Sequence, residues 1–213
     1  MKYDIVIIGS GLGGLLCSYI LSKEGYNVCL LEKNNQLGGC MQTFKRNNAV
    51  FDTGMHYIGG MDEGQVLNKY FQYFKLSDKL KLRRMDENGY EIIQYEGKEY
   101  KFAMGYDRFT ETMLEYFPNE REALVKYTSK MKEISTSVDL YNVREYSMQP
   151  SGYFDYFSVG IDDFLNSITS NKTLKNTLLG LSPLYAGVKD RTPMYMHLII
   201  HASFIGSAYR FVD

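Results

Sequence analysis

The sequence has few cysteines, little net charge and no long apolar run, and each shortage excludes a class of protein. Its 213 residues include three cysteines, which are too few and too irregularly spaced for a zinc site or a disulfide framework. The formal net charge is -1, so no overall field attracts nucleic acid, and no basic motif indicates a nucleic-acid partner. The longest apolar stretch, residues 194–208, carries two histidines and falls short of the roughly 18 residues of a membrane span. We therefore expect a globular protein of a reducing compartment, the cytoplasm.

Glycines are concentrated near the N-terminus, directly after a short apolar run. Residues 3–8 predict a fully buried parallel strand, because they are apolar, largely β-branched and cut off by a glycine. Apolar side chains then recur at helical spacing over residues 12–23, and a second apolar run covers residues 27–31. This order predicts the β-α-β start of a dinucleotide-binding α/β fold.

The glycine spacing indicates the chemistry of that start. Gly9 allows a tight turn, Gly11 lets a pyrophosphate approach the backbone, and Gly14 lets the helix pack closely on the strand. The helix N-terminus offers free N–H groups to phosphates. Glu32 follows 18 residues after Gly14, near the roughly 20 expected for an acid that binds ribose hydroxyls. A carboxylate there would repel a 2′-phosphate, so NADP is disfavoured as the bound nucleotide, while FAD and NAD both remain open.

A second group of motifs follows Glu32. The pair Gly38–Gly39 would bring side-chain-free backbone to the same phosphates. A hairpin is predicted over residues 42–53, turning at Asn47–Asn48, because asparagine tolerates positive φ. Its second arm runs into the segment Phe-Asp-Thr-Gly-Met-His-Tyr-Ile-Gly-Gly, residues 51–60.

Together these motifs resemble the N-terminal portion of the glutathione-reductase-type flavoproteins. Within them they are most similar to the family of phytoene desaturases, carotenoid isomerases and retinol saturases. The residues that carry the resemblance are Glu32-Lys33, Leu37-Gly38-Gly39-Cys40, Thr43-Phe44 and residues 51–59. Many flavoproteins of this type have Arg or Lys after the glycine pair, whereas Cys40 suits the retinol saturase branch better than the amine oxidases.

The resemblance implies FAD as cofactor, with NAD(P)H as a candidate external reductant. It assigns the pyrophosphate to Gly9, Ser10, Gly11, Leu12, Gly13 and Gly14, the adenosine ribose to Glu32, the diphosphate and ribityl chain to Gly38, Gly39 and Cys40, and the isoalloxazine ring to Gly54, Met55 and His56. Lys33, beside Glu32, is a further cofactor-binding candidate. His56 is the candidate catalytic residue, as a proton donor. The alternative for His56 is a structural histidine bonded to nearby backbone.

The fold class implied is α/β: a Rossmann-like FAD-binding unit of the glutathione-reductase type with an inserted α+β substrate domain. We place the first domain at residues 1–60 and an incomplete substrate domain at residues 61–213. We expect the chain to be truncated and to bind FAD poorly by itself. The activity implied is flavin-mediated hydride transfer to or from carbon–carbon bonds of an apolar, polyene-like substrate of the carotenoid or retinoid class. A flavin amine oxidase and a non-catalytic nucleotide-binding fragment are the alternatives, and the oligomeric state is left open.

Local patterns after residue 60 predict the remaining elements. Helices are expected at residues 65–76, 108–117, 161–168 and 173–181, near 119–138 and from about 193, with a hairpin over residues 90–104. Asp107 and Asn119 are the expected N-caps of two helices, and Pro183 is expected to stop another.

Two features of this part bear on partners. Residues 143–160 are aromatic and irregular, which makes them a candidate for a gate or for peripheral membrane association, with a loop packed on its own core as the alternative. His197 and His201 have a spacing that can bind metal, but no acidic residue accompanies them. We therefore predict no metal site, and histidines that face a pocket or are satisfied in the core.

Overall fold

Residues 2–139, 141–145 and 153–212 are described by the computed structural model, and they fall into two units divided between His56 and Tyr57. Residues 57–60, which the sequence prediction assigned to the first domain, pack in the second unit, where Ile58 and Gly59 pair with the C-terminal strand. The assignment of one domain to the cofactor and the other to the substrate stays a prediction.

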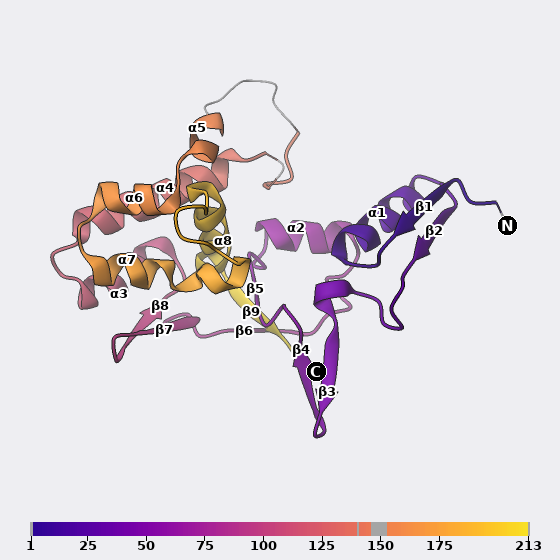
Figure 1. Cartoon of the computed structure of the whole chain (residues 1–213), viewed down its shortest axis with the longest axis horizontal. Helices are drawn as coiled ribbons and strands as arrows, with labels where there is room; N and C mark the ends of the chain where they lie inside the picture. Colours follow the sequence, from indigo (N-terminus) through magenta and orange to yellow (C-terminus); the bar gives the residue numbers. More distant parts are fainter. Residues whose placement is uncertain (1, 140, 146–152, 213) are drawn as a thin grey trace. The chain divides into compact units, whose positions relative to one another are not determined.

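The first unit opens with the predicted β-α-β order. Its elements are β1 (Ile5–Ile8), α1 (Leu12–Lys23) and β2 (Val28–Leu31), as Figure 1 shows. The two strands pair in parallel, with Ile5 opposite Val28 and Ile8 opposite Leu31. Helix α1 ends because Gly25 takes a φ of 93°, which lets the following residue donate its N–H to the carbonyl of Leu21 at 3.2 Å.

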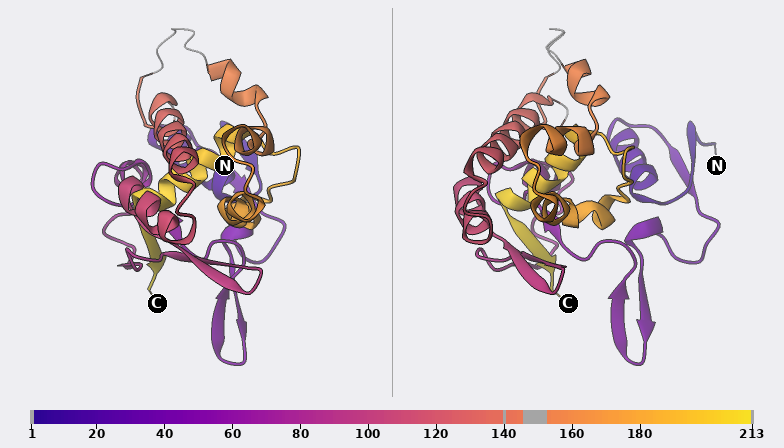
Figure 2. Two further views of the ribbon diagram at one scale, coloured as in Figure 1. Left: turned by 90° about the vertical axis from the view of Figure 1, so that its left-hand side faces the viewer. Right: turned by 60° about the vertical axis from the view of Figure 1, so that its left-hand side comes forward.

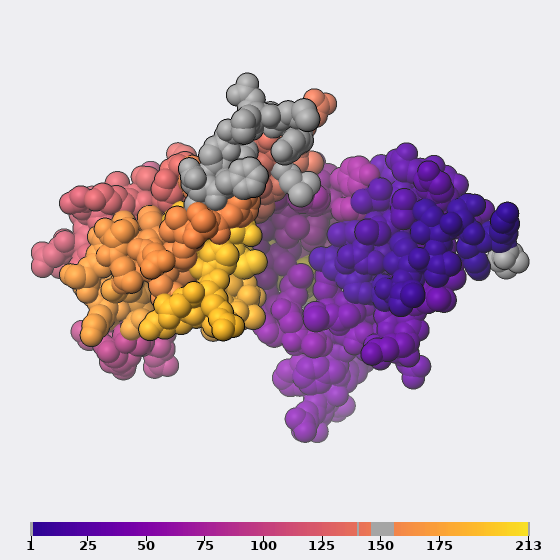
Figure 3. Space-filling model, turned by 45° about the horizontal axis from the view of Figure 1, so that its top comes forward, coloured from indigo at the N-terminus to yellow at the C-terminus, as the bar shows by residue number. Residues whose placement is uncertain are grey.

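The prediction of a fully buried first strand is wrong. Val6 is 55% exposed and Ile8 is 86% exposed. Among the described residues β1 pairs with β2 alone, and α1 contributes no buried side chain, so one face of the strand is uncovered. In the space-filling view, the N-terminal part of the chain is the indigo region (Figure 3).

The first unit continues through a short 3₁₀ helix, η1 (Gly39–Met41), into a hairpin of β3 (Thr43–Arg46) and β4 (Ala49–Asp52). The predicted turn is confirmed: Asn47 and Asn48 have φ values of 49° and 64°, as a two-residue hairpin turn requires. Phe44 and Phe51 stack across the strands with ring centroids 5.2 Å apart, although both rings are about half exposed.

The second unit combines small antiparallel sheets with a helical core (Figures 1 and 2). Its elements are β5 (Ile58–Gly59), α2 (Val66–Tyr73), β6 (Leu82–Arg84), β7 (Glu91–Tyr95), β8 (Lys98–Phe102), α3 (Tyr106–Tyr116), α4 (Arg121–Ser137), α5 (Tyr153–Ser158), α6 (Ile161–Ile168), α7 (Lys172–Leu178), the 3₁₀ helix η2 (Leu179–Tyr185), α8 (Met194–Gly206) and β9 (Ala208–Phe211). One sheet has the order β5-β9-β6, and β7 pairs with β8 in the predicted hairpin. Helices α4 and α8 lie side by side (Figure 2).

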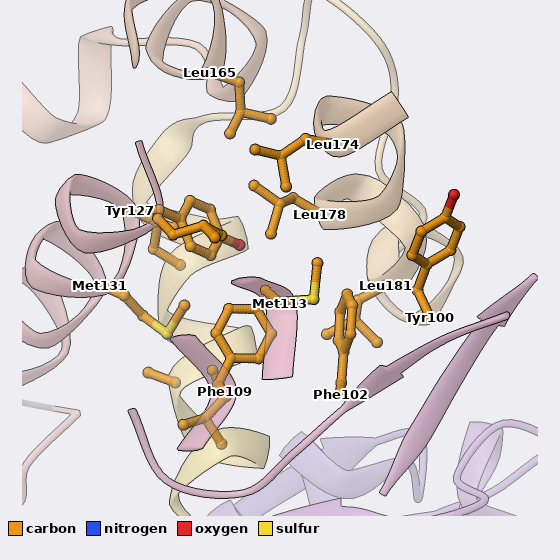
Figure 4. Close-up of a cluster of buried hydrophobic side chains, with 14 of the residues drawn as sticks. Tyr100, Phe102, Phe109, Met113, Tyr127, Met131, Leu165, Leu174, Leu178 and Leu181 are labelled. Carbon is orange, nitrogen blue, oxygen red and sulfur yellow. The ribbon is translucent and has the colours of Figure 1, made fainter. Parts of the chain in front are cut away.

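The core of this unit follows the predicted apolar seam of α4. Leu124, Tyr127, Met131 and Ile134 are completely buried. The ring of Phe109 in α3 lies with its centroid 6.4 Å from that of Tyr127 and 5.3 Å from that of Phe102 in the hairpin, within the same buried cluster (Figure 4). The periodicity of α4 therefore located the core correctly.

Three helix boundaries differ from the sequence prediction. Helix α3 begins after Gly105, whose φ of 91° only glycine adopts readily, so Asp107 lies inside the first turn. Helix α4 has Glu120 at its N-cap in place of Asn119. The α-helix predicted over residues 173–181 changes to the tighter η2 at Leu179, since the ring of Pro183 would clash with the carbonyl four residues earlier in an α-helix.

The aromatic segment at residues 143–160 is only partly described. Residues 146–152 lie outside the described residues, and the part that follows them forms α5 where a loop was predicted. Across the described ranges, no helix is long and apolar enough to cross a membrane.

Candidate dinucleotide-binding site

The glycine loop joins the end of β1 to α1 by a turn that glycine alone permits. Gly9 has a φ of 96°, and its N–H donates to the carbonyl of Leu31 at 2.7 Å. A Cβ at Gly14 would lie 2.0 Å from the carbonyl oxygen of Gly9, so any side chain there would push the helix away from the turn. A Cβ at Gly11 or Gly13 would meet nothing within 4 Å. The outer side of the loop is therefore open backbone, which suits the approach of a phosphate.

No side chain of α1 caps its N-terminus or neutralises the partial positive charge there. Gly11 is the N-cap and forms no side-chain cap, and the first turn holds no acidic residue. The first N–H groups of a helix have no partner within the helix. They are thus free to bind an anion in front of Leu12 and Gly13.

Glu32, directly after β2, holds the glycine loop through Ser10. Its Oε2 accepts the backbone N–H of Ser10 at 2.9 Å and the hydroxyl of Ser10 at 2.6 Å. Its Oε1 accepts the N–H and the side-chain N–H of Asn34 at 2.9 and 3.0 Å. These hydrogen bonds, chiefly the one from the Ser10 hydroxyl, lower the pKa of Glu32 to about 2, so the side chain is a carboxylate at neutral pH.

The pairing of Ser10 with Glu32 was missed at the level of sequence. Sequence reasoning assigned Glu32 to a ribose and Ser10 to a phosphate, each by itself. The signal that could have joined them is the position of a hydroxyl residue at the carboxyl end of β1, beside the carboxyl end of the parallel strand β2. Neighbouring parallel strands bring such positions together at one edge of a sheet.

The second glycine pair touches the first loop, as the sequence indicated. Gly38 donates its N–H to the carbonyl of Ser10 at 2.9 Å. A Cβ at Gly39 would lie 3.0 Å from the Cα of Gly11. Gly38 has a φ of 110° and is the N-cap of η1. Two glycine-rich backbone segments therefore meet at the N-terminus of α1.

The predicted flavin-ring segment lies against the second glycine pair. A Cβ at Gly54 would come within 3.0 Å of the carbonyl oxygen of Cys40. Met55 is half-buried and His56 is exposed. For the His56 ring we find no hydrogen-bond partner in the described part of the chain, so no backbone bond supports a structural role. Lys33 is exposed beside Glu32.

His197 and His201 form a buried hydrogen-bonded cluster in the second unit. The Tyr127 hydroxyl lies 2.7 Å from both His197 Nε2 and His201 Nδ1, and the Tyr185 hydroxyl lies 2.5 Å from His197 Nδ1. Burial lowers the pKa of His197 to about 3 and that of His201 well below its usual value, so both rings are neutral. His201 Nε2 is buried and has no hydrogen-bond partner among the described residues. The same residues contain no group of three side chains that could hold a metal ion. His197 is satisfied in the core as predicted, and His201 only at one nitrogen.

The sequence is similar to a known domain family and to known enzymes. A family model described as an NAD(P)-binding Rossmann-like domain matches residues 7–74. The human all-trans-retinol 13,14-reductase is 27% identical over 221 residues, which cover 93% of this chain and 35% of that protein. The chain thus spans about a third of the length of this relative.

Two carotenoid enzymes match a shorter part. Prolycopene isomerase 2 (chloroplastic) of an Oncidium hybrid cultivar is 30% identical over 139 residues, 65% of this chain and 24% of that protein. The carotenoid 3,4-desaturase of Haloarcula japonica is 32% identical over 128 residues, 59% of this chain and 25% of that protein.

Among solved structures, wild-type putrescine oxidase bound to putrescine superimposes with a TM-score of 0.59 at 16% identity, covering 100% of this chain and 46% of that one. This likeness shows the fold alone, and it agrees with the predicted α/β class. A Rossmann-like domain model thus matches the start of the chain, which is similar to a retinol reductase over 93% of its length and to a carotenoid desaturase over 59%, as residues 9–14, 32–40 and 51–59 had indicated.

Proposed function

We propose that these residues belong to an FAD-dependent oxidoreductase that acts on carbon–carbon bonds of an apolar polyene. The observation that carries the proposal is the meeting of the glycine-rich turn Gly9–Gly14 with the pair Gly38–Gly39 at the uncapped start of α1, beside the carboxylate of Glu32. That arrangement fits a dinucleotide diphosphate with an adjacent ribose. The named relatives, which act on retinol and carotenoids, supply the substrate class.

The residues present fit FAD in the order that the sequence indicated. The open face of Gly9–Gly14 would hold the pyrophosphate, and Glu32 would bind the adenosine ribose. Of the four bonds to Glu32, the two from the exposed Asn34 are the ones that ribose hydroxyls could replace, because those from Ser10 fix the loop. Cys40 and Gly54 would follow the cofactor toward its ring.

FAD, when bound, supplies the hydride chemistry, and the protein's share is to bind, orient and exclude water. We assign proton transfer to the exposed His56, which follows the segment packed against Cys40. NAD(P)H is the external reductant in the saturating direction. Association with a membrane surface, through residues 143–160, and a cytoplasmic location belong to the same proposal.

Product analysis tests this proposal. The protein from its native source is incubated with all-trans-retinol or a carotenoid, with the flavin chemically reduced in one sample and oxidised in another. We expect a product that differs from the substrate by two hydrogen atoms, or a double-bond isomer, formed only when FAD is present. Oxidation of a diamine with release of hydrogen peroxide, and unchanged polyenes, would replace the proposal by an amine oxidase.

A further inference from the structure

A polar cavity of about 300 Å³ lies in the second unit between α6 and α7, two of the orange helices in Figure 1. Three lysines, Lys172, Lys175 and Lys189, line it together with two aspartates and two asparagines. A second cavity of about 370 Å³, on the side of η2, shares Asp162 and Asn176 with the first. The two cavities adjoin, so one small ligand can extend across both of these lobes.

The first lobe offers cations that have no counter-ion. Lys172 and Lys175 lie about one turn apart on α7, where like charges repel each other. Lys175 Nζ donates to Asn166 Oδ1 at 2.7 Å. In the described part of the chain we find neither an ion pair nor a hydrogen bond for the side chains of Lys172 and Lys189. An anion in this lobe would offset the repulsion, and a phosphate has enough oxygens to accept from all three lysines.

Lys189 stands on a turn that hydrogen bonds hold in place. The hydroxyl of the buried Thr192 accepts the N–H of Val188 at 2.8 Å and donates to the carbonyl of Val188 at 2.9 Å. The N–H of Asp190 donates to Asp162 Oδ2 at 3.1 Å, which ties the turn to the start of α6. The backbone that carries Lys189 is therefore fixed beside the cavity before a ligand binds.

The second lobe holds groups that suit hydroxyls. Asn176 donates its Nδ2 to the Tyr95 hydroxyl at 2.7 Å, so its Oδ1 is left as an acceptor. Asp162 uses Oδ2 for the turn and keeps Oδ1 as a second acceptor. Ser182 Oγ lies 3.1 Å from the Tyr185 hydroxyl, and a serine hydroxyl can both donate and accept. Two acceptors and a hydroxyl match the neighbouring hydroxyls of a sugar.

We propose that this two-lobed site binds a sugar phosphate, with the phosphate beside the three lysines and the sugar hydroxyls at the acceptors of the second lobe. Such a ligand is polar throughout, so it is a different molecule from an apolar substrate. The inference does not rest on the proposed function, because every residue that it uses lies in the second unit. The same chemistry occurs in a free sugar phosphate and in the ribose phosphate of a nucleotide.

An NMR titration of the isotope-labelled full chain tests the site and reads it separately from the glycine loop. The probes are ribose 5-phosphate, inorganic phosphate, ribose and adenosine monophosphate. We expect ribose 5-phosphate to shift the amides of residues 161–192 and to bind about threefold or more tighter than phosphate, since its hydroxyls add hydrogen bonds. Ribose should cause no shift. Tighter binding of adenosine monophosphate at these amides would assign the ligand to the nucleotides, and equal or weaker binding to the free sugar phosphates.

Two substitutions separate the lobes. Lys172→Gln should weaken the binding of both phosphates by about threefold, because it removes one exposed cation. Asp162→Asn keeps an oxygen that can accept the N–H of Asp190, but it removes a negative charge. It should therefore strengthen the binding of inorganic phosphate and reduce the preference for ribose 5-phosphate. A purely structural role of Asp162 would change neither in this way.

Lys126→Gln is the matched control, because Lys126 pairs with Glu122 on α4 at 2.7 Å and lines neither lobe. Shifts confined to residues 2–56, no binding by the wild type, ribose binding equal to that of ribose 5-phosphate, or an equal loss in Lys126→Gln would each overturn the proposal. Lys172 is exposed and makes no hydrogen bond that we find among the described residues, so Lys172→Gln decides the matter even if Asp162→Asn disturbs the turn.

Discussion

At the scale of single residues, Glu32 has two tasks that its position after β2 makes compatible. One oxygen holds the glycine loop through Ser10, and the other meets the exposed Asn34, where a ribose could enter. The first task is local structure and the second is recognition. Sequence spacing predicted only the second, because it measures distance to the glycines and carries no information on which side chain faces the acid.

Glu32→Ala should therefore weaken FAD binding in the protein from its native source by about tenfold or more. The reason is that Ser10 loses its acceptor and the ribose loses its partner together. Glu32→Gln keeps one oxygen acceptor, so its affinity for FAD should lie between that of Glu32→Ala and that of the wild type. Glu24→Ala is the control, since Glu24 caps the far end of α1 through its backbone alone. Fluorescence titration with FAD measures all three, and an unchanged affinity in Glu32→Ala would refute the ribose assignment.

The buried histidines make the stability of the second unit depend on pH. Folded His197 has a pKa of about 3 against an ordinary 6.5, so below pH 6.5 the unfolded chain takes up a proton that the folded core refuses. The stability present above pH 6.5 is therefore lost progressively as the pH falls toward 3. We expect a decrease of about 1.4 kcal/mol per pH unit for each buried histidine well below pH 6.5.

Urea unfolding at pH 7, 6 and 5, followed by circular dichroism, measures that slope. This pH range ends above the pH at which protonation of carboxylates begins to dominate the pH dependence of stability. His56→Gln is the control, because it removes an exposed histidine of the first unit and leaves the buried cluster intact. A stability that stays constant from pH 7 to pH 5 would contradict the neutral buried cluster of Tyr127, His197 and His201.

At the scale of elements, the contact between α1 and the end of β1 depends on one glycine. Gly14→Ala would place a Cβ 2.0 Å from the Gly9 carbonyl oxygen, which forces the helix outward. We expect it to destabilise the first unit by more than about 1 kcal/mol.

Gly13→Ala offers a control one residue away. Its Cβ would meet nothing within 4 Å, and alanine is the better helix former by about 1 kcal/mol, so the first unit should become no less stable. Hydrogen exchange at the amides of residues 2–56 measures the stability of the first unit and distinguishes the two variants. Equal stability of Gly14→Ala and wild type would mean that the close approach is absent in solution.

Elements that rest on local chemistry were predictable from the sequence. The Asn47–Asn48 turn, the β-α-β order and the apolar seam of α4 all follow from residues within a few positions of each other. The exposure of β1 did not follow, because burial of a strand depends on partners that are remote in sequence. The start of α3 was misplaced because an N-cap aspartate is a common signal, whereas Gly105 acts through its positive φ.

At the scale of the whole molecule, the two units differ in what the sequence reveals of them. The residues assigned to the nucleotide all lie in Met1–His56, whereas a cavity at the start of α2, the end of α4 and α8 lies in Tyr57–Asp213. The first set follows from glycine spacing, which leaves a sequence signature, and it stays a prediction. The cavity could not be predicted, since Gln65, Tyr106 and Tyr141 are remote in sequence and come together only in the folded second unit.

The cofactor itself is the most direct test of the central claim that Gly9–Gly14, Glu32 and Gly38–Cys40 hold FAD. The protein from its native source is denatured, the released nucleotide is identified by chromatography and mass spectrometry, and its amount is compared with the protein concentration. We predict one FAD per protein and no NAD. Release of NAD or NADP in place of FAD, or of no nucleotide from the natively folded protein, would contradict the account.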